Sequence, residues 1–403
     1  MTKADTNSAV FGQLQQDLLI VGGGIMGVWA AYYAAQAGLK TLLVERGTLG
    51  CGTSGGLLGA LMPHAPDRWN DKKQFQFDAL ISLEGEIRQV EAASGLQAGY
   101  RRSGRLVPLA KPHLRAIADE QVGSASTHWT TYFSGHRPGH FSWQTRDTPF
   151  APDWPVASTC LHGCTFDTLS ARVSPRQLIA VLRAVLEQSP LVTLREHTEL
   201  ETLNPAEGKA VLAGGDAVHF GHAILAAGVR AFPLLDAIQP GLKPSGTAVK
   251  GQAALLQADI DPNWPILFDR GLYIVPHENG SVAIGSTSEV EFADPGSTDG
   301  KLDDLLDEAC ALSPLLRGAP VIERWAGLRP KAIGRDPMVG HHPEFPRLSL
   351  LTGGFKVSFG LAHRLAQSVV ESLTGTSAIS LPAAFRVEAH LDKMRGYRAL
   401  IAH

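Results

Sequence analysis

The chain has 403 residues, of which 44% are hydrophobic and 19% charged, and its formal net charge is −3. This length predicts about two domains, and the near-neutral charge argues against an extended nucleic-acid interface, which needs a surplus of Lys and Arg. The four cysteines are accompanied by no second Cys or His pair at zinc spacing, so we expect no metal site. Residues 1–16 lack the apolar core of a signal peptide, and no uncharged apolar stretch is long enough to span a membrane, which favours a cytoplasmic enzyme.

A glycine-rich turn follows the first predicted strand, the apolar run Leu-Leu-Ile-Val at 18–21. Gly22, Gly24 and Gly27 stand in GxGxxG spacing. In this spacing the first glycine permits a tight turn, the second lets a diphosphate approach the backbone, and the third lets the following helix pack closely. The turn therefore predicts a dinucleotide site.

A helix is predicted from Ile25 to Ala37, and Gly38 ends it. Its free amide groups and positive end would face the diphosphate. A second strand at 41–44 leads to Glu45, whose carboxylate would accept hydrogen bonds from the adenosine ribose. Strand, turn, helix, strand and acid in this order indicate a Rossmann-type unit, which would serve FAD and NAD alike.

The segment after the acid favours FAD. It reads GTLGCGTSGGLLGALMPH over residues 47–64 and is rich in Gly, Ser and Thr. Such a loop can wrap a diphosphate and continue under a flavin ring, whereas an NAD domain normally proceeds directly to another helix and strand. No second GxGxxG follows a strand, so we expect electrons to enter from an organic substrate rather than from a nicotinamide.

This loop and several later blocks resemble the D-amino-acid oxidase superfamily of flavoproteins, in patterns similar to glycine oxidase and sarcosine oxidase. The blocks occur in the family order and are ARVSPRQLIAVLRAVLEQ (171–188), HAILAAGVRA (222–231), LYIVPHENGSVAIGSTSE (272–289), WAGLRPKAIGRDPMVG (325–340) and LLTGGFKVSFGLAHRLAQSVVESLTG (350–375). The chain departs from the family where Gly354 replaces a frequent His and where Val357-Ser358 replaces a frequent Asn-Gly. These departures concern the substrate rather than the cofactor.

The resemblance implies an α/β fold with a discontinuous Rossmann-type FAD-binding domain and a second, α+β substrate domain built on a mostly antiparallel sheet. The FAD-binding domain is expected from residues 16–69, 170–240 and 325–373. The substrate domain is expected from residues 70–169 and 241–324, and residues 374–403 would form a C-terminal tail.

Four local features are predicted within these domains. Phe75–Ser94 has the pattern of a long helix, and residues 123–155 have the composition of an irregular loop. Asn279-Gly280 indicates a hairpin turn. Ser174 and Pro175 suit the N-cap and the first position of a helix.

Cofactor contacts are assigned to the glycine turn, the acid, the Ser-rich loop and the later family blocks. They are Gly22, Gly24, Ile25, Met26, Gly27, Glu45, Arg46, Thr53, Ser54, Gly55, Gly56, Leu57, Leu58, Leu200, Ala227, Gly228, Gly353, Gly354, Phe355, Lys356, Val357 and Ser358. No Cys lies near the C-terminal block to link a flavin covalently, so we expect non-covalent FAD.

Four side chains are candidates for the chemistry. The resemblance implies that Arg329 grips a substrate carboxylate with its guanidinium, and that the Tyr273 hydroxyl is a second carboxylate contact. Lys356 would stabilise negative charge on reduced flavin or position the substrate, and His64 would border the flavin. Each also has a purely structural interpretation: a domain-bridging arginine, a core tyrosine, a surface lysine and a structural histidine.

The resulting hypothesis is an FAD-dependent oxidoreductase that oxidises the C–N bond of a small amino acid or secondary amine. Hydride transfer to flavin N5 would leave an imine, which water hydrolyses, and oxygen or another acceptor would take the electrons. Two alternatives remain: a tRNA-modifying flavoprotein acting on a glycine-like uridine arm, and a flavin-carrying subunit of a dehydrogenase complex. Assembly into a homo-oligomer is left open.

Overall fold

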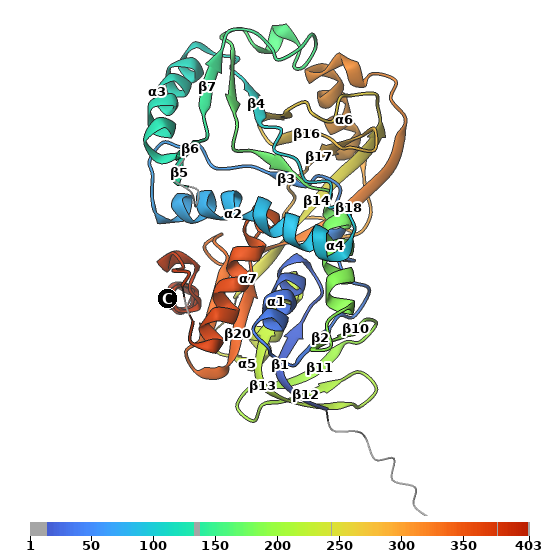
Figure 1. The fold of residues 1–403 in the computed structure, drawn as a ribbon, viewed down its shortest axis with the longest axis vertical. Coiled ribbons are helices and arrows are strands. Elements are labelled where there is room, and N and C mark those ends of the chain that lie inside the picture. Colours follow the sequence, from blue (N-terminus) through green and yellow to red (C-terminus); the bar gives the residue numbers. More distant parts are fainter. Residues whose placement is uncertain (1–13, 133–137, 243, 377, 402–403) are drawn as a thin grey trace, which may run out of the picture.

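The protein is built around two large mixed sheets. The computed structural model describes residues 14–401, apart from 133–137, 243 and 377. Within this part of the chain each of the two sheets has eight strands. In Figure 1 the sheet that contains β1 and β13 lies below the sheet that contains β4 and β14, and helix α2 crosses between the two parts.

The lower sheet has the predicted Rossmann-type arrangement. Its strands run in the order β10-β2-β1-β13-β12-β11, with β20 paired to β13 and β19 paired to β20, and β1 is parallel to both β2 and β13. Their bounds are β1 Leu14–Val21, β2 Thr41–Val44, β10 Val192–Arg195, β11 Leu200–Asn204, β12 Lys209–Leu212, β13 Ala217–Leu225, β19 Met338–His342 and β20 Phe345–Thr352.

Both faces of this sheet are covered, which explains the continuous apolar run in β1. Leu18 and Ile20 pack in one core with helices α1, α4 and α7, whereas Leu19 and Val21 pack in a second core with α5 and α8. The helices are α1 Ile25–Gln36, α4 Pro175–Glu187, α5 Ala231–Ile238, α7 Ser358–Thr374 and α8 Val387–Ile401. Helix α8 lies in the predicted C-terminal tail, and its Leu391 is fully buried.

The upper sheet is mostly antiparallel, as expected for the substrate domain. Its order is β18-β14-β17-β16-β15-β4-β8-β7, and β15 with β4 is its one parallel pair among the described residues. The bounds are β4 Arg105–Pro108, β7 Trp143–Arg146, β8 Cys164–Asp167, β14 Gly246–Gln257, β15 Ile266–Asp269, β16 Leu272–Pro276, β17 Ser281–Gly285 and β18 Val321–Ala332. Residues 325–332, predicted as part of the FAD-binding segments, pair with β14 in this sheet.

The two faces of the upper sheet have different roles. Ala254 and Leu256 of β14 pack against α6 (Gly300–Leu312), whereas Ala253 belongs to a small core on the opposite face, together with Leu57 and Val275. Because side chains alternate along a strand, β14 separates a helix-covered face from a face that is turned to the loop after Glu45.

The remaining elements lie beside these sheets. Helix α2 (Asp71–Ser94) begins at Asn70, whose Oδ1 accepts hydrogen bonds from the amides of Lys72 and Lys73, both at 3.1 Å. Ser174 occupies the predicted N-cap of α4, but its side chain makes no capping hydrogen bond. The short pairs are β3 Ala60–Leu61 with β9 Ala171–Arg172, and β5 Thr130–Tyr132 with β6 Pro138–His140. No helix of the described residues has the length and apolarity to span a membrane.

The prediction of an irregular loop over 123–155 is wrong in part. Helix α3 (Pro112–His128) extends into this range, and β7 occupies 143–146. Trp129 and Trp143, fully or nearly buried, pack edge to face at 5.8 Å between ring centroids. Tertiary packing of these aromatic rings orders a segment whose composition alone favours a loop.

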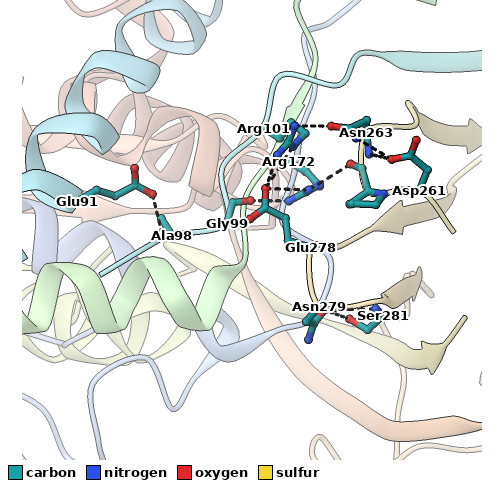
Figure 2. A network of polar contacts seen from close by, with 11 residues as sticks. Glu91, Ala98, Gly99, Arg101, Arg172, Asp261, Asn263, Glu278, Asn279 and Ser281 are labelled. Atoms are coloured by element: carbon teal, nitrogen blue, oxygen red, sulfur yellow. Dashed lines mark hydrogen bonds and ion pairs between the residues drawn. The ribbon is translucent and has the colours of Figure 1, made fainter. Parts of the chain in front are cut away.

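A buried arginine joins the two parts of the molecule (Figure 2). Arg172 is completely buried, and its guanidinium donates hydrogen bonds to Gly99 O at 2.6 Å and Pro262 O at 3.2 Å. Glu278, in the turn between β16 and β17, accepts from Arg101 at 2.9 Å and from Arg172 at 3.5 Å. These contacts tie the segments at 99–101 and 171–172 to the hairpin between β16 and β17.

Candidate active site

A cavity of about 260 Å³ lies where the two sheets meet. Its lining comes from the β1–α1 turn, the ends of β2 and β13, the loop at 51–60, the inner face of the upper sheet and the start of α7. The predicted residues that line it are Gly22, Gly24, Ile25, Met26, Glu45, Arg46, Thr53, Ser54, Gly56, Leu57, Leu58, Ala227, Gly228, Tyr273, Arg329, Phe355, Lys356 and Ser358.

The glycine turn is closely packed, and Gly24 is its least crowded position. Gly22 has φ +110°, and a Cβ there would lie 2.6 Å from Ala226 O, so the turn packs directly on the end of β13. A Cβ on Gly27 would collide with Gly22 O, so the first turn of α1 packs directly on the glycine turn. At Gly24, by contrast, a Cβ would meet only the Ser54 Oγ, at 3.2 Å. Gly24 is the N-cap of α1 and has no side-chain cap, so the amide end of the helix faces the cavity.

Glu45 stands at the end of β2, beside this turn. Its Oε2 accepts a hydrogen bond from Gly23 N at 2.8 Å, and its Oε1 accepts one from Gly47 N at 2.9 Å. The carboxylate is thereby held at the mouth between strand and loop, where it can accept further hydrogen bonds from hydroxyl groups. Leu200, a predicted contact outside the main cavity, lines a smaller pocket of about 70 Å³ that also borders Glu45.

The loop after Glu45 is anchored on both sides of the cavity. Ser54 Oγ accepts from Ile25 N at 2.9 Å, which ties the loop to the start of α1. Thr53 Oγ1 donates to Leu328 O on β18, and the His277 ring contacts Leu57 O at 3.1 Å. The Ser-rich loop therefore connects the nucleotide side of the cavity with the upper sheet.

The loop between β20 and α7 closes the other end. Phe355 has φ 46° in the left-handed region and donates from its amide to Pro330 O at 3.1 Å. A Cβ on Gly354 would fall 2.6 Å from the Met26 Cε, so this loop packs tightly on α1. Lys356 follows and lines the cavity; burial and the nearby Arg329 lower the pKa of its ammonium.

Arg329 and Tyr273 come from different strands and face the cavity together. The Arg329 side chain is 9% exposed and lies across Gly251, where a Cβ would collide with the guanidinium. Burial lowers the pKa of Arg329, while Tyr273 and Glu289 act in the opposite direction. Burial raises the pKa of the Tyr273 hydroxyl, and Arg105 and Arg329 oppose that rise, so the phenol stays protonated at neutral pH.

Several predicted residues do not line the main cavity. His64 lies apart from it, with its ring Nδ1 2.7 Å from Gln76 Oε1. Gly55 supports the loop instead, because its carbonyl accepts from Arg176 Nε at 2.8 Å. The remaining positions serve backbone packing or lie just behind the lining: Gly27, Gly353, Gly354 and Val357.

Trp325, Ala253 and Ser286 line the cavity although sequence reasoning did not single them out. Trp325 and Arg329 each lie two residues from Gly327 on β18, one before it and one after it. Their side chains therefore point to the same face of the sheet. A Cβ on Gly327 would collide with the Trp325 ring, so the ring lies over Gly327. Period-2 alternation in WAGLR could have indicated Trp325, whereas Ala253 and Ser286 carry no such signal.

The residues present fit FAD. The cavity extends from Glu45 and Arg46, beside the glycine turn, to Tyr273 and Arg329 on the upper sheet. An extended cofactor needs such a cavity, because its nucleotide end and its reacting end lie far apart. Gly24, which carries no side chain, and the amino-terminal end of α1, where only the first amide is taken by Ser54, suit the diphosphate.

Comparisons with known proteins support this interpretation. Residues 17–368 match the family model DAO, described as FAD dependent oxidoreductase. Glycine oxidase from Bacillus licheniformis is 25% identical over 374 residues, covering 89% of this chain and 93% of that protein. Glycine oxidase from Geobacillus kaustophilus is 26% identical over 384 residues, covering 94% and 98%.

Solved structures show the same fold. The crystal structure of glycine oxidase from Geobacillus kaustophilus superposes with a TM-score of 0.78 at 21% identity, over 93% of this chain and 99% of that one. Iminodiacetate oxidase from Chelativorans sp. BNC1 superposes with a TM-score of 0.77 at 22% identity, over 92% and 98%. The family match spans most of the chain and every segment that builds the cavity, and the chain therefore belongs to the DAO family of FAD-dependent oxidoreductases.

Proposed function

We propose that the protein oxidises the C–N bond of a small amino acid or secondary amine that carries a carboxylate, with bound FAD as the first electron acceptor. The relatives named glycine oxidase support an amino-acid or amine substrate. FAD supplies the acceptor for the hydride that leaves the carbon next to nitrogen. The chain's own side chains bind the substrate, orient it and exclude water.

The observation that carries this proposal is the state of Arg329. Within the described residues its guanidinium makes one hydrogen bond, from Nη1 to Thr287 O at 3.1 Å, and no carboxylate lies within ion-pair distance. A buried cation without an acidic partner is costly, and a carboxylate ligand compensates it. The remaining donors of its planar fork suit both oxygens of a carboxylate.

Tyr273 and Lys356 complete the proposed substrate end. The protonated Tyr273 hydroxyl would donate a second hydrogen bond to the carboxylate held by Arg329. Lys356 would add positive charge at the same end, where it favours anionic substrates and negative charge on the reduced cofactor. His64 is left out of this proposal, since it is not among the residues that line the cavity and its ring is hydrogen-bonded to Gln76.

We further propose that FAD is bound non-covalently and that molecular oxygen reoxidises it. Cys51 is the one cysteine among the described lining residues, and its Sγ lies 3.6 Å from the Glu45 carboxylate, at the nucleotide end. An oxygen electrode with glycine or sarcosine as reductant tests the acceptor, since oxygen consumption at the rate of flavin reduction is expected. An acceptor dye that works while oxygen does not would contradict it.

The proposed substrate class is tested by anaerobic titration of the purified flavoprotein. Loss of the yellow flavin absorbance is expected with glycine, sarcosine or proline, and not with methylamine, which lacks the carboxylate. Arg329→Met should keep its FAD and lose about 10²–10³-fold in the second-order rate of reduction, since two charge-assisted hydrogen bonds disappear. Arg324→Met is the matched control, because Arg324 lies on the same strand but pairs with Asp303 outside the cavity. Equal reduction by amino acids and methylamine, or an unimpaired Arg329→Met, would refute the assignment.

The family match does not favour the tRNA-modifying alternative. Relatives that match this chain over more than 90% of their own length are named glycine oxidase, after a small amino acid. The family model that matches residues 17–368 is described as FAD dependent oxidoreductase.

A further inference from the structure

We propose that Thr287, Glu289 and Gln252 are positioning residues that hold the Arg329 guanidinium from behind the sheet and leave its outer donors free for the substrate. The inference rests on the proposed function, because it assumes that Arg329 receives a carboxylate. It concerns a polar cluster on the helix-covered face of β14, which the reaction itself does not contact.

Few contacts hold the Arg329 side chain on the cavity side. Arg329 pairs with Val249 across β14 and β18, and its side chain lies over Gly251. Its one hydrogen bond within the described residues goes to the carbonyl of Thr287 at 3.1 Å. The direction of the guanidinium therefore depends on where that carbonyl stands.

The Thr287 carbonyl is placed by two contacts to β14 and one to Glu289. Gln252 N donates to Thr287 Oγ1 at 2.9 Å, and Thr287 N donates to Gln252 O at 3.3 Å. Thr287 Oγ1 in turn donates to Glu289 Oε1 at 2.6 Å. The hydroxyl thus acts as acceptor and donor at once, which fixes both the side chain and the backbone of Thr287.

Glu289 lies on the face of the sheet opposite to Arg329. The backbones of Glu289 and Lys250 exchange two hydrogen bonds, each of 2.9 Å, so their side chains share a face. Lys250 lies one position from Val249, the partner of Arg329, and successive residues of a strand point to opposite faces. The carboxylate of Glu289 therefore acts on the guanidinium through Thr287 and not by direct contact.

The carboxylate is fully engaged on its own face. Glu289 is 7% exposed and, besides Thr287, accepts from Gln252 Nε2 at 2.9 Å and from Lys301 Nζ at 2.7 Å. Burial would raise the pKa of Glu289, but the hydrogen bonds from Lys301, Thr287 and Gln252 hold it below its usual range. A permanently charged carboxylate behind the strand compensates part of the buried positive charge without occupying a donor that faces the cavity.

Gln252 connects this cluster to a rigid element. Its side chain is completely buried, its Nε2 donates to Asp299 Oδ1 at 2.8 Å, and its Oε1 accepts from Asp299 N at 2.8 Å. Asp299 is the N-cap of α6 and accepts from Lys301 N at 3.1 Å. The helix start, β14 and the segment after β17 are thereby held together behind Arg329.

The test separates the Thr287 hydroxyl from the size of the residue. Thr287→Val removes the hydroxyl at nearly constant volume, and Thr287→Ser retains it. In the FAD-loaded protein, we expect Thr287→Val to raise the Kd for acetate, measured from the shift of the flavin absorption bands, and the KM for glycine by about five- to tenfold. The limiting rate of flavin reduction should change less than about twofold, because the chemical step does not involve Thr287.

Controls distinguish this inference from the proposed function. Thr287→Ser should restore the wild-type Kd, and Thr247→Val, an exposed change on the same β14, should leave it unchanged. Glu289→Gln keeps an acceptor for the Thr287 hydroxyl but removes a negative charge near Arg329, so the salt dependence of acetate binding should rise above that of the wild type. If Arg329→Met abolishes acetate binding while Thr287→Val and Glu289→Gln bind it as the wild type does, the positioning inference alone is refuted. If the wild-type flavoprotein binds no carboxylate, both proposals are refuted.

Discussion

A single methyl group at Gly251 should separate stability from substrate binding. A Cβ there would lie less than 3.0 Å from Nη1 and Nη2 of Arg329, whereas ordinary contacts begin at 3.4 Å. Gly251 is not among the residues with a left-handed backbone, so Ala can adopt its conformation. The atoms in the way are the far end of a flexible side chain, and we therefore expect Gly251→Ala to fold with a midpoint of thermal unfolding close to that of the wild type.

The functional cost should be much larger, because the guanidinium has to leave its place. A displacement of about 1 Å at a positioning group costs about 10²-fold in rate. The variant should therefore lose about 10²-fold in the second-order rate of flavin reduction by glycine while its Kd for FAD is unchanged. The loss in the rate of reduction should not exceed that of Arg329→Met, which removes both charged hydrogen bonds.

The assay is anaerobic stopped-flow reduction, with FAD affinity measured separately on apoprotein. Gly85→Ala on the surface of α2 is the matched control, since a Cβ there meets no atom within 4 Å. Wild-type reduction by Gly251→Ala would show that Arg329 can bind the carboxylate from another position, and the account of its placement would then be wrong. Equal losses in FAD affinity and in reduction would instead indicate general misfolding.

Two further predictions concern pH and the cofactor. Burial, followed by the charge of Arg172, lowers the pKa of His277 to about 4 from 6.5, so the native state binds fewer protons than the unfolded chain between these values. The free energy of unfolding should fall as pH drops from about 6.5 to 4, by about 3 kcal/mol from this residue, and urea unfolding of His277→Gln should show a correspondingly shallower pH dependence. For the cofactor, Glu45→Gln should weaken FAD binding by about tenfold or more, because the bonds to Gly23 and Gly47 and the acceptor for ribose lose their charge. Fluorescence titration of the apoprotein with FAD measures this, and an unchanged Kd would contradict the role of Glu45.

The nucleotide half of the cavity was predictable because it is local in sequence. One strand-turn-helix-strand unit contains Gly22, Gly24, Gly27 and Glu45. Their spacing along the chain follows directly from the role that each has in this unit. The structure places all but Gly27 on the cavity wall, and Gly27 at the close contact with Gly22 that the motif requires.

The proposed substrate half was predictable only through resemblance to known flavoproteins. Arg329 and Tyr273 belong to strands β18 and β16, which are separated in the sheet by β14 and β17, and no local spacing relates them. Trp325 and Ser286 were missed because their place on the cavity depends on register and on how the two sheets meet. The Thr287 cluster was missed for the same reason, since it joins residues of β14, the segment after β17 and the start of α6.

The two halves are mechanically connected through β18. Thr53 of the Ser-rich loop donates to Leu328 O, and the next residue along the strand is Arg329. Pro330 O accepts from Phe355 N, in the loop that carries Lys356. A strand fixed by hydrogen bonds on both sides of Arg329 cannot shift without moving the loops that line the cofactor site. Cofactor binding should therefore order the proposed carboxylate site in advance, and substrate should bind more weakly to apoprotein than to the FAD-loaded form even where it contacts only the upper sheet.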